Sequence, residues 1–367
     1  MKNKTVVIGL SGGVDSAVSA YLLKQQGYNV IAVFMQNWDS LINNETNYSS
    51  EFDVCDAQID YDVAQKIAKH LDIPLYRVEF IKEYWDYVFQ YFINEYNNGN
   101  TPNPDVLCNK YIKFDAFLKY AFENFHCDYI ATGHYAKITK KDDQYCLSLC
   151  KDENKDQTYF LCEINKNYLS KIIFPLSNLL KQEVREIAKQ INLPNFNRKD
   201  STGICFIGER NFRNFLQNYI PNQPGKIIDI TNNNIVGEHQ GVMYYTIGQR
   251  KGLNLGGLSE KYFVCKKDIN NKIIYVAPNS LENIYLQSNC CEIRTFNWLY
   301  TPKHFNNIKA RFRHRQKLQD VNIEINNGIL YVSYESQKNI VAGQFCVLYQ
   351  ENICLGGGPI FKVFKKN

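Results

Sequence analysis

The sequence lacks three features that would each define a class of protein. No run approaches the roughly 20 uninterrupted apolar residues that a membrane-spanning helix needs. None of the 12 cysteines forms a Cys-x-x-Cys pair, the spacing typical of zinc ribbons and thioredoxin-like sites. The first residues run into an apolar, β-branched segment rather than a secretory leader, so we expect a cytoplasmic protein with reduced cysteines.

What the sequence does contain is enough apolar material for large cores. Hydrophobic residues make up 45% of its 367 residues, with 26 Tyr and 22 Phe, which excludes intrinsic disorder. At about 100–200 residues per domain, this length predicts two or three domains. The 42 Lys and Arg against 37 Asp and Glu give a net charge of +5, which permits a nucleic-acid partner without requiring one.

The first 200 residues alternate between strand-like and helix-like patterns. Apolar and β-branched runs predict strands at 5–10, 29–35, 75–80 and 129–132. Helical periodicity predicts helices at 16–26, 57–71, 83–96 and 112–125. Strands that alternate with helices in this way predict an α/β fold with a doubly wound, mainly parallel sheet.

The later part of the chain has a different pattern. Turn-forming residues divide it into short pieces, and from about residue 273 short alternating strands predict a small β-barrel or sandwich. We therefore predict three parts: an α/β catalytic domain over 1–208, a small middle domain over 209–275 and a C-terminal β-barrel-like domain over 276–367.

A glycine-rich segment joins the first predicted strand to the first predicted helix. It consists of Gly9, Leu10, Ser11, Gly12, Gly13, Val14, Asp15 and Ser16. Glycines allow an anion to approach the backbone, and the helix N-terminus adds partial positive charge. The segment is not a Walker A loop, because no Lys follows the glycines, and Gly-x-Gly-x-x-Gly cannot be aligned with it. The alternative to phosphate binding is a structural turn in which Ser11 or Asp15 caps the helix.

Two other segments are expected beside this loop. Met35 ends the second predicted strand, and Gly133 and His134 follow a later one. Ligands of open α/β sheets bind outside the carboxyl ends of the strands, so the three segments are predicted to share one crevice. The alternatives are that Met35 and His134 are core residues and that Gly133 forms a plain turn.

Cys108 and Cys205 differ in their surroundings from the other cysteines. Cys108 follows a stiff loop containing Pro102 and Pro104, close to a predicted helix start and to Lys110, where a thiolate is favoured. Cys205 lies among small and positively charged residues, which suit an approachable thiol. For each of them a buried packing role is the alternative.

A run of alternating cations lies at 309–317 near the end of the chain. In a strand, Lys309, Arg311, Arg313, Arg315 and Lys317 would point to one side and form a ladder suited to RNA phosphates. The alternative is a solvated edge strand whose charges prevent aggregation.

The motifs together carry a family resemblance. Ser-Gly-Gly-Val-Asp-Ser after the first strand resembles the PP-loop of ATP pyrophosphatases, which split ATP between the α and β phosphates. Further motifs follow in the order of one family, at 101–114, 131–135, 155–161, 201–210 and 247–253. Over nearly its whole length, the chain resembles the bacterial-type tRNA-specific 2-thiouridylases, which put sulfur on C2 of the wobble uridine, position 34. Tyr111 departs from the acidic residue that the family often has there.

The resemblance implies roles for individual residues. Cys108 would be the nucleophile, Cys205 the persulfide carrier, and Asp105 an acid/base or base-positioning group. The residues implied to bind ATP are Gly9, Leu10, Ser11, Gly12, Gly13, Val14, Asp15, Ser16, Met35 and Gly133. Those implied to meet the target base are Asn103, Pro104 and Asp105. Those implied to contact tRNA are His134, Lys155, Asp156, Gln157, Arg311, Phe312 and Gln344.

The resemblance also implies the chemistry and the partners. ATP, with Mg²⁺, would adenylate the C2 oxygen of the uridine, and the persulfide sulfur would then attack C2. Cys108 and Cys205 would end as a transient disulfide. The sulfur would come from a sulfur-relay protein or a cysteine desulfurase.

Two other functions remain as alternatives. Another PP-loop adenylating enzyme, such as a lysidine-type amidating synthetase, leaves both cysteine motifs unexplained. A non-catalytic RNA-binding or sulfur-carrier protein with a degenerate loop conflicts with the intact loop sequence.

Overall fold

A parallel sheet forms the centre of the N-terminal domain. The structure is a computed structural model that describes residues 4–38, 56–200, 212–257 and 260–366. The strands are β1 (Thr5–Gly9), β2 (Asn29–Gln36), β3 (Leu75–Glu79), β4 (Tyr129–Ala131) and β7 (Ile172–Ile173), in the order β3-β2-β1-β4-β7. All neighbours pair in parallel. The strand order reverses between β1 and β4, so the ligand crevice of such a sheet is expected at their carboxyl ends.

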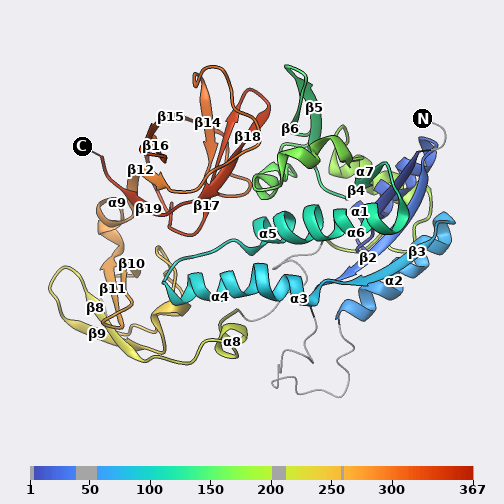
Figure 1. Ribbon diagram of the computed structural model, residues 1–367. Helices are drawn as coiled ribbons and strands as arrows, with labels where there is room; N and C mark the ends of the chain where they lie inside the picture. Colours follow the sequence, from blue (N-terminus) through green and yellow to red (C-terminus); the bar gives the residue numbers. More distant parts are fainter. Residues whose placement is uncertain (1–3, 39–55, 201–211, 258–259, 367) are drawn as a thin grey trace, which may run out of the picture.

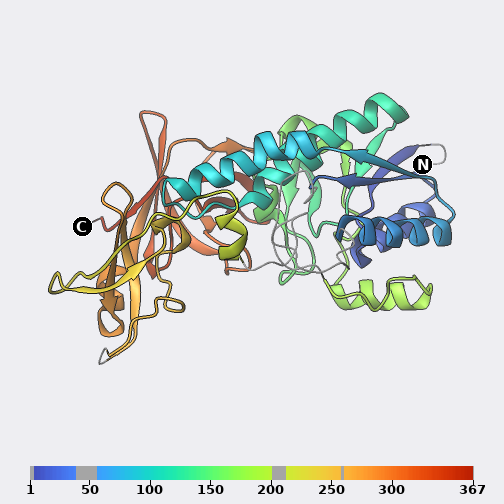
Figure 2. The same ribbon diagram turned by 90° about the horizontal axis from the view of Figure 1, so that it is seen from below.

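Helices cover both faces of this sheet because its strands are apolar on both sides. One core contains α1 (Val14–Gln25), α2 (Asp56–Leu71) and α7 (Lys181–Gln190). The other core contains the chain of helices from α3 to α4 and from α5 to α6. Figure 2 shows the sheet between these two layers. The predicted doubly wound α/β fold is confirmed.

The helices of the second layer are interrupted by π-helical turns. They are α3 (Ile81–Tyr84), η1 (Trp85–Phe89), α4 (Gln90–Asn97), α5 (Pro104–Leu107), η2 (Cys108–Ala116) and α6 (Phe117–Phe125). Short single-turn helices lie elsewhere: η3 (Thr158–Leu161), η4 (Lys166–Lys171), η5 (Val242–Tyr244), η6 (Asn279–Leu281), α8 (Phe212–Gln217) and α9 (Glu282–Tyr285). In the described part of the chain, no helix has the length and apolar character that crossing a membrane requires.

The middle of the chain forms a small sheet with its own core. Its strands are β8 (Gly225–Asp229), β9 (Ile235–His239), β10 (Tyr262–Asp268) and β11 (Ile273–Pro278), in the order β10-β11-β8-β9. Ile227, Val264 and Ile274 are fully buried in that core. This sheet lies at the far end of the molecule from the parallel sheet (Figure 1).

The C-terminal domain is an antiparallel β structure. Its strands are β12 (Gln287–Ile293), β13 (Asn297–Trp298), β14 (Ile308–Arg311), β15 (Gln319–Asn326), β16 (Ile329–Lys338), β17 (Phe345–Gln350), β18 (Ile353–Pro359) and β19 (Lys362–Phe364). The order along the sheet is β19-β12-β16-β15-β14-β17-β18-β6-β5. The prediction of a C-terminal β domain is confirmed.

The last two strands of that sheet come from the N-terminal part of the chain. The hairpin β5 (Lys137–Lys141) and β6 (Gln144–Ser148) reaches β18 through the pair Ile353 and Ser148. This hairpin was not predicted, although its turn residues Asp142 and Asp143, both with positive φ, are typical of tight hairpin turns. The hairpin joins the α/β and β domains into one body.

The prediction of a five-cation ladder over 309–317 is wrong. Strand β14 ends at Arg311, and the chain turns directly afterwards, with φ of +63° at Arg315. Phe312 is buried in the β-domain core, which ends the alternation of exposed side chains. Arg311 is buried as well, and Lys309 pairs with Asp320 at 3.4 Å.

Candidate functional site

The glycine-rich loop has the geometry of an anion site. It connects the end of β1 to α1, and its N-cap residue Gly13 is extended and has no side-chain cap hydrogen bond. The first N–H groups of α1 are therefore available to a ligand. Gly12 has φ of +77°, a conformation that favours glycine. Neither Ser11 nor Asp15 caps α1, because its N-cap residue is Gly13 and no side chain accepts a capping hydrogen bond there.

Two serines brace the loop from inside. The Ser16 hydroxyl donates to the Gly13 carbonyl at 3.0 Å and lies 3.3 Å from the Ser11 hydroxyl. The Ser11 N–H donates to the Ser16 hydroxyl at 3.3 Å. The loop is thus held in a defined shape before any ligand binds, which reduces the entropy cost of binding.

A lysine from α7 forms an ion pair with the acidic residue of this loop. Lys181 Nζ lies 2.7 and 2.8 Å from the two carboxylate oxygens of Asp15. The Tyr135 hydroxyl donates to the same carboxylate at 3.0 Å. The sequence analysis missed Lys181, because nothing in the pattern of its helix indicates contact with a loop 166 positions earlier in the chain.

Asp200 forms ion pairs with several cations near this loop. It lies 2.8 Å from Lys181, 2.6 Å from Lys155 and 2.5 Å from Arg185. Partial burial alone would raise the pKa of Asp200, but hydrogen bonds from Lys155 and Lys181 outweigh it and hold that pKa well below its usual value. Lys155, predicted to contact tRNA, is therefore placed beside the nucleotide loop.

Two further side chains fix the loop from its other side. Asn195 Nδ2 donates to the Gly12 carbonyl at 2.9 Å, and Arg198 donates to the same oxygen at 3.3 Å. Arg198 also pairs with Asp60. Asn195 precedes Cys205 by ten residues and was not among the predicted site residues.

The three segments predicted to share one crevice do meet there. The methyl group of Met35 lies 3.0 Å from the position that a Cβ on Gly9 would take. A Cβ on Gly133 would lie 2.7 Å from the backbone nitrogen of Ser16. Gly133 therefore has a packing reason to be glycine, since the start of α1 presses against it.

We expect Gly133→Ala to disturb the loop specifically. Its new methyl group would collide with the backbone of α1 and push the first turn away from the nucleotide, raising the Kd for ATP by at least about tenfold. Calorimetric titration with a non-hydrolysable ATP analogue measures this. The control is Gly256→Ala, which adds its methyl group in open space and should leave the Kd unchanged. Gly27→Ala is less suitable, because Gly27 has a positive φ that disfavours alanine. An unchanged Kd in Gly133→Ala would contradict the close approach.

His134 lies at the same edge but is enclosed. It is 9% exposed, with its ring centroid 5.7 Å from Phe114 and 6.2 Å from Phe174. The Thr132 hydroxyl and His134 Nδ1 are 2.7 Å apart. Burial and the nearby Lys113 charge lower the pKa of His134 well below its usual value, so the ring is neutral at physiological pH. A contact with tRNA stays a prediction for this residue.

Cys108 begins the helix η2 and is fully buried. The preceding turn α5 starts at Pro104, with Asn103 in an extended conformation at its N-cap and Asp105 in its first turn. Cys108 belongs to the same apolar cluster as Met35, which includes the layer between the sheet and the helices from α3 to α6. Access to its sulfur requires this cluster to open when substrates bind.

Lys110 does not supply a free charge beside Cys108. Its ammonium group pairs with Glu163 at 2.7 Å. Burial raises the pKa of Glu163, although Lys110 opposes this, and Glu163 in turn raises the pKa of Lys110 against the effect of burial. Any activation of the Cys108 thiol by Lys110 therefore needs this ion pair to rearrange.

Most other described cysteines are inert packing residues. Burial raises the pKa of Cys127 to about 11 and the pKa values of Cys150, Cys265 and Cys354 to about 12. Such thiols stay protonated at neutral pH and make poor nucleophiles. Cys205 lies within 201–211, outside the described residues, so its predicted approach to Cys108 stays a prediction.

The C-terminal domain holds the loop that precedes Cys108. Gln344 Nε2 donates to the Thr101 carbonyl at 2.7 Å, and the Thr101 N–H donates to the Ala342 carbonyl at 3.1 Å. Gly343 packs directly on Thr101, because a Cβ there would lie 2.8 Å from its nitrogen. Gln344, predicted to contact tRNA, is thus placed where it positions the Asn103–Asp105 segment.

Asp156 and Arg311 form a buried link between the two domains. Their side chains are 1% and 8% exposed and lie 2.8 Å apart. Thr158 also donates to Asp156, at 2.6 Å, and Gln157 accepts from the Tyr135 N–H at 2.9 Å. The structure therefore places Asp156, Gln157 and Arg311 in contacts within the protein, and their predicted tRNA contacts are not tested by it.

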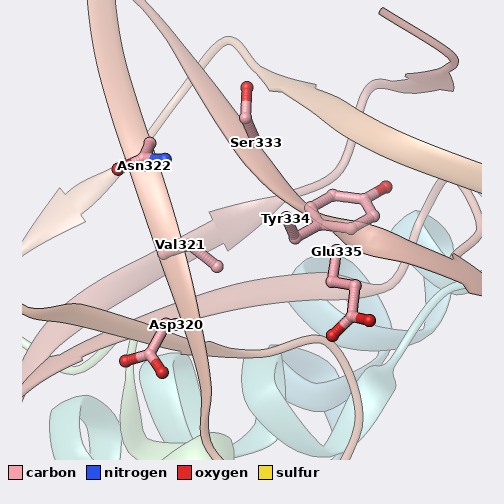
Figure 3. Close-up of a pocket in the computed structure, with 6 residues that line it drawn as sticks. All are labelled: Asp320, Val321, Asn322, Ser333, Tyr334 and Glu335. Carbon is pink, nitrogen blue, oxygen red and sulfur yellow. The ribbon is translucent and has the colours of Figure 1, made fainter.

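A pocket elsewhere has the wrong charge for a nucleotide. It lies between β15 and β16 in the C-terminal domain and is lined by Asp320, Val321, Asn322, Ser333, Tyr334 and Glu335 (Figure 3). Its carboxylates repel phosphates. Within the described ranges, no group of three or more His, Cys, Asp or Glu is arranged to hold a metal ion.

Comparisons with known proteins assign the chain to a family. The family model described as the tRNA methyl transferase HUP domain matches residues 4–209, the tRNA methyl transferase PRC-barrel domain matches 213–278, and the aminomethyltransferase beta-barrel domain matches 288–360. These three models define a HUP domain followed by two barrel domains.

Curated relatives match over nearly the whole chain. The tRNA-specific 2-thiouridylase MnmA of Ureaplasma urealyticum is 57% identical over 97% of this chain and 95% of its own. Those of Malacoplasma penetrans and Mycoplasmopsis synoviae are 55% and 54% identical, over 97% and 98% of this chain and 98% and 96% of their own. The chain belongs to the tRNA-specific 2-thiouridylase family, whose members are tRNA sulfurtransferases. Among solved structures, the chain is similar to NMN synthetase from Francisella tularensis, with 20% identity and a TM-score of 0.30. The match covers 54% of this chain and 66% of the synthetase, and it is too distant to inform the description of the site.

Proposed function

We propose that this protein catalyses the ATP-dependent 2-thiolation of the wobble uridine, U34, of tRNA. The observation that carries the proposal is the convergence of the PP-loop, Met35 and Gly133 at one edge of the sheet, with Met35 and Cys108 in the same apolar cluster. An ATP-activating loop beside a cysteine is the arrangement that adenylation followed by sulfur transfer requires. The parts of the enzyme are assigned as 1–208 for catalysis, 209–275 for the middle domain and 276–367 for tRNA binding.

The loop and its neighbours prepare ATP for attack. The N–H groups at the start of α1 bind the leaving pyrophosphate. Lys181, paired with Asp15 and Asp200 in the free protein, neutralises the pyrophosphate by exchanging a carboxylate partner for it. The C2 oxygen of U34 attacks the α-phosphate, which breaks the α–β bond and releases pyrophosphate. The adenylated oxygen is then a good leaving group. Mg²⁺ usually binds through phosphates and one or two carboxylates, and Asp15 is the carboxylate on this loop.

The two cysteines supply the sulfur in the second step. The terminal sulfur of the Cys205 persulfide attacks C2 and displaces AMP. The Cys108 thiolate attacks the inner sulfur of Cys205, which breaks the S–S bond and leaves a Cys108–Cys205 disulfide for a cellular reductant. Asp105, in the first turn of α5, moves a proton at the base or holds its edge, together with Asn103 and Pro104.

The persulfide comes from a sulfur-relay protein or a cysteine desulfurase, and the reaction takes place in the cytoplasm. His134, Lys155, Asp156, Gln157, Arg311, Phe312 and Gln344 are proposed to contribute to tRNA binding. Since several of these are buried, they act mainly by shaping the surface on which the anticodon region lies.

The exposed cations after β14 are better candidates for direct phosphate contacts than the buried Arg311. We expect Arg313→Glu combined with Arg315→Glu to weaken tRNA binding and to reduce the slope of log K against log salt by about 2. Filter binding from low to high salt measures both. Lys66→Glu combined with Lys69→Glu makes the same charge change on the exposed surface of α2 and should leave the slope unchanged. Equal slopes for the two double variants would contradict the assignment.

An assay of AMP and pyrophosphate formation tests the proposed function. With ATP, a persulfide donor and unmodified tRNA, the protein should form AMP, pyrophosphate and 2-thiouridine in equal amounts. Formation of AMP without thiolation, or with incorporation of an amine, would favour a different PP-loop adenylating enzyme. Absence of all three products would contradict the proposal.

A further inference from the structure

Several buried asparagines around the crevice have amide atoms without a hydrogen-bond partner. In the described chain, these atoms are Asn109 Oδ1, Asn195 Oδ1 and both amide atoms of Asn37. Asn109 follows Cys108, and Asn195 holds the PP-loop carbonyl of Gly12. Buried polar atoms are nearly always paired, so each of these unpaired amide atoms calls for an explanation.

Asn37 is the most exceptional of the three. It is 1% exposed, and neither its amide nitrogen nor its amide oxygen has a partner among the residues that the structure describes. Asn109 and Asn195 each use the amide nitrogen in a hydrogen bond, to the carbonyls of Phe160 and Gly12. An amide that makes no hydrogen bond with either end destabilises the free protein, so its presence indicates a ligand that satisfies it.

Asn37 lies at the carboxyl end of a strand in the parallel sheet. It directly follows β2, whose carboxyl end lies beside that of β1. Met35, two residues earlier, touches the start of the PP-loop at Gly9. Trp38, the next residue, is buried in the cluster that also contains Cys108. Asn37 therefore lies at the carboxyl end of the parallel sheet, where the ligands of open α/β sheets bind.

We propose that Asn37 recognises the edge of a nucleobase in this crevice. A primary amide presents a donor and an acceptor side by side, which pair with neighbouring groups on a base edge. Uracil offers N3–H beside a carbonyl, and adenine offers N1 beside its amino group. The inference rests on the proposed function, which makes these two bases the ones that enter the crevice.

Asn37→Leu separates recognition from packing. The leucine has a similar size and no polar atoms, so it removes two unpaired groups and should leave the melting temperature of the free protein equal or higher. Binding of the recognised base should weaken by at least about tenfold. If Asn37 had only a packing role, the variant would bind both bases as the wild type does.

Asn297→Leu is the matched control. Its amide nitrogen donates to the carbonyls of Cys162 and Ile164, both at 3.0 Å, so the same substitution leaves two carbonyls unpaired. We expect this variant to melt at a lower temperature and, below its transition, to bind both ligands as the wild type does.

Two titrations identify the base. The first measures the Kd of a non-hydrolysable ATP analogue. The second measures the affinity of an anticodon stem-loop with U34 relative to the same stem-loop abasic at position 34, so that phosphate contacts cancel. A tenfold loss confined to the first assigns adenine, and loss of the U34 preference assigns uracil.

The proposal is overturned if Asn37→Leu keeps wild-type values in both titrations, or if its melting temperature falls as far as that of Asn297→Leu. If instead the wild-type protein binds neither the ATP analogue nor the stem-loop with a preference for U34, the proposed function fails, whatever Asn37 does.

Discussion

Replacing Cys108 with serine or alanine should lower the rate of tRNA thiolation by on the order of 10³-fold or more, while leaving the adenylation step intact. In the proposed sequence, pyrophosphate leaves before either sulfur reacts. Under single-turnover conditions, a variant that is blocked at sulfur release should therefore still release up to one equivalent of pyrophosphate. Quenched-flow measurement of pyrophosphate, AMP and 2-thiouridine separates the two steps.

The control for this prediction is another buried cysteine. Cys127 lies in the same core cluster and is 5% exposed, and its thiol is held protonated by burial. Cys127→Ser should lose some stability but retain thiolation. If Cys108→Ala thiolated tRNA as fast as Cys127→Ser, Cys108 would not be the nucleophile that releases the sulfur.

Removing the guanidinium of Arg311 should destabilise the joint between the domains by about 3–5 kcal/mol. Arg311→Met leaves the Asp156 carboxylate buried without its cation, because Asp156 is 2% exposed and the pair lies inside the interface. Chemical denaturation, followed by tryptophan fluorescence and by circular dichroism, measures the loss.

Two further variants establish the cause. Arg311→Met combined with Asp156→Asn removes both charges and should recover part of the lost stability. The recovery is partial because the Asn side chain has one oxygen for the two groups that donate to Asp156, the Thr158 hydroxyl and the Cys150 N–H. Lys309→Gln, on the same strand, breaks the exposed pair with Asp320 and should cost less than about 1 kcal/mol. A loss in Arg311→Met no larger than that in Lys309→Gln would show that the buried pair does not hold the domains together.

The α/β part of the fold was predictable because its signals are local. Each strand is a short β-branched run, each helix has apolar residues at helical spacing, and the PP-loop occurs at the junction where β1 meets α1. The convergence of Met35 and Gly133 on that loop followed from the rule for parallel sheets, since all three segments leave the carboxyl ends of their strands.

The contacts that lock the site were not predictable, because they join residues far apart in the chain. Lys181 forms an ion pair with Asp15. Arg311 is buried and paired with Asp156, although the alternation of cations around it is typical of an exposed strand. An alternating charge pattern predicts which face of a strand each side chain would occupy. It does not predict where the strand ends or which other elements pack on that face. The prediction of a cation ladder was wrong for that reason, because β14 ends at Arg311 and the next residue, Phe312, is buried in the core.

The central claim, sulfur transfer to U34 through two cysteines, is tested most directly by mass spectrometry of tRNA nucleosides. The tRNA is isolated from a bacterial strain that lacks its own 2-thiouridylase and expresses this protein, either unchanged or as Cys108→Ser or Cys205→Ser. We predict 2-thiouridine at the wobble position with the unchanged protein and none with either variant, at equal protein levels. Normal 2-thiouridine in both variants, or its absence with the unchanged protein, would contradict the account.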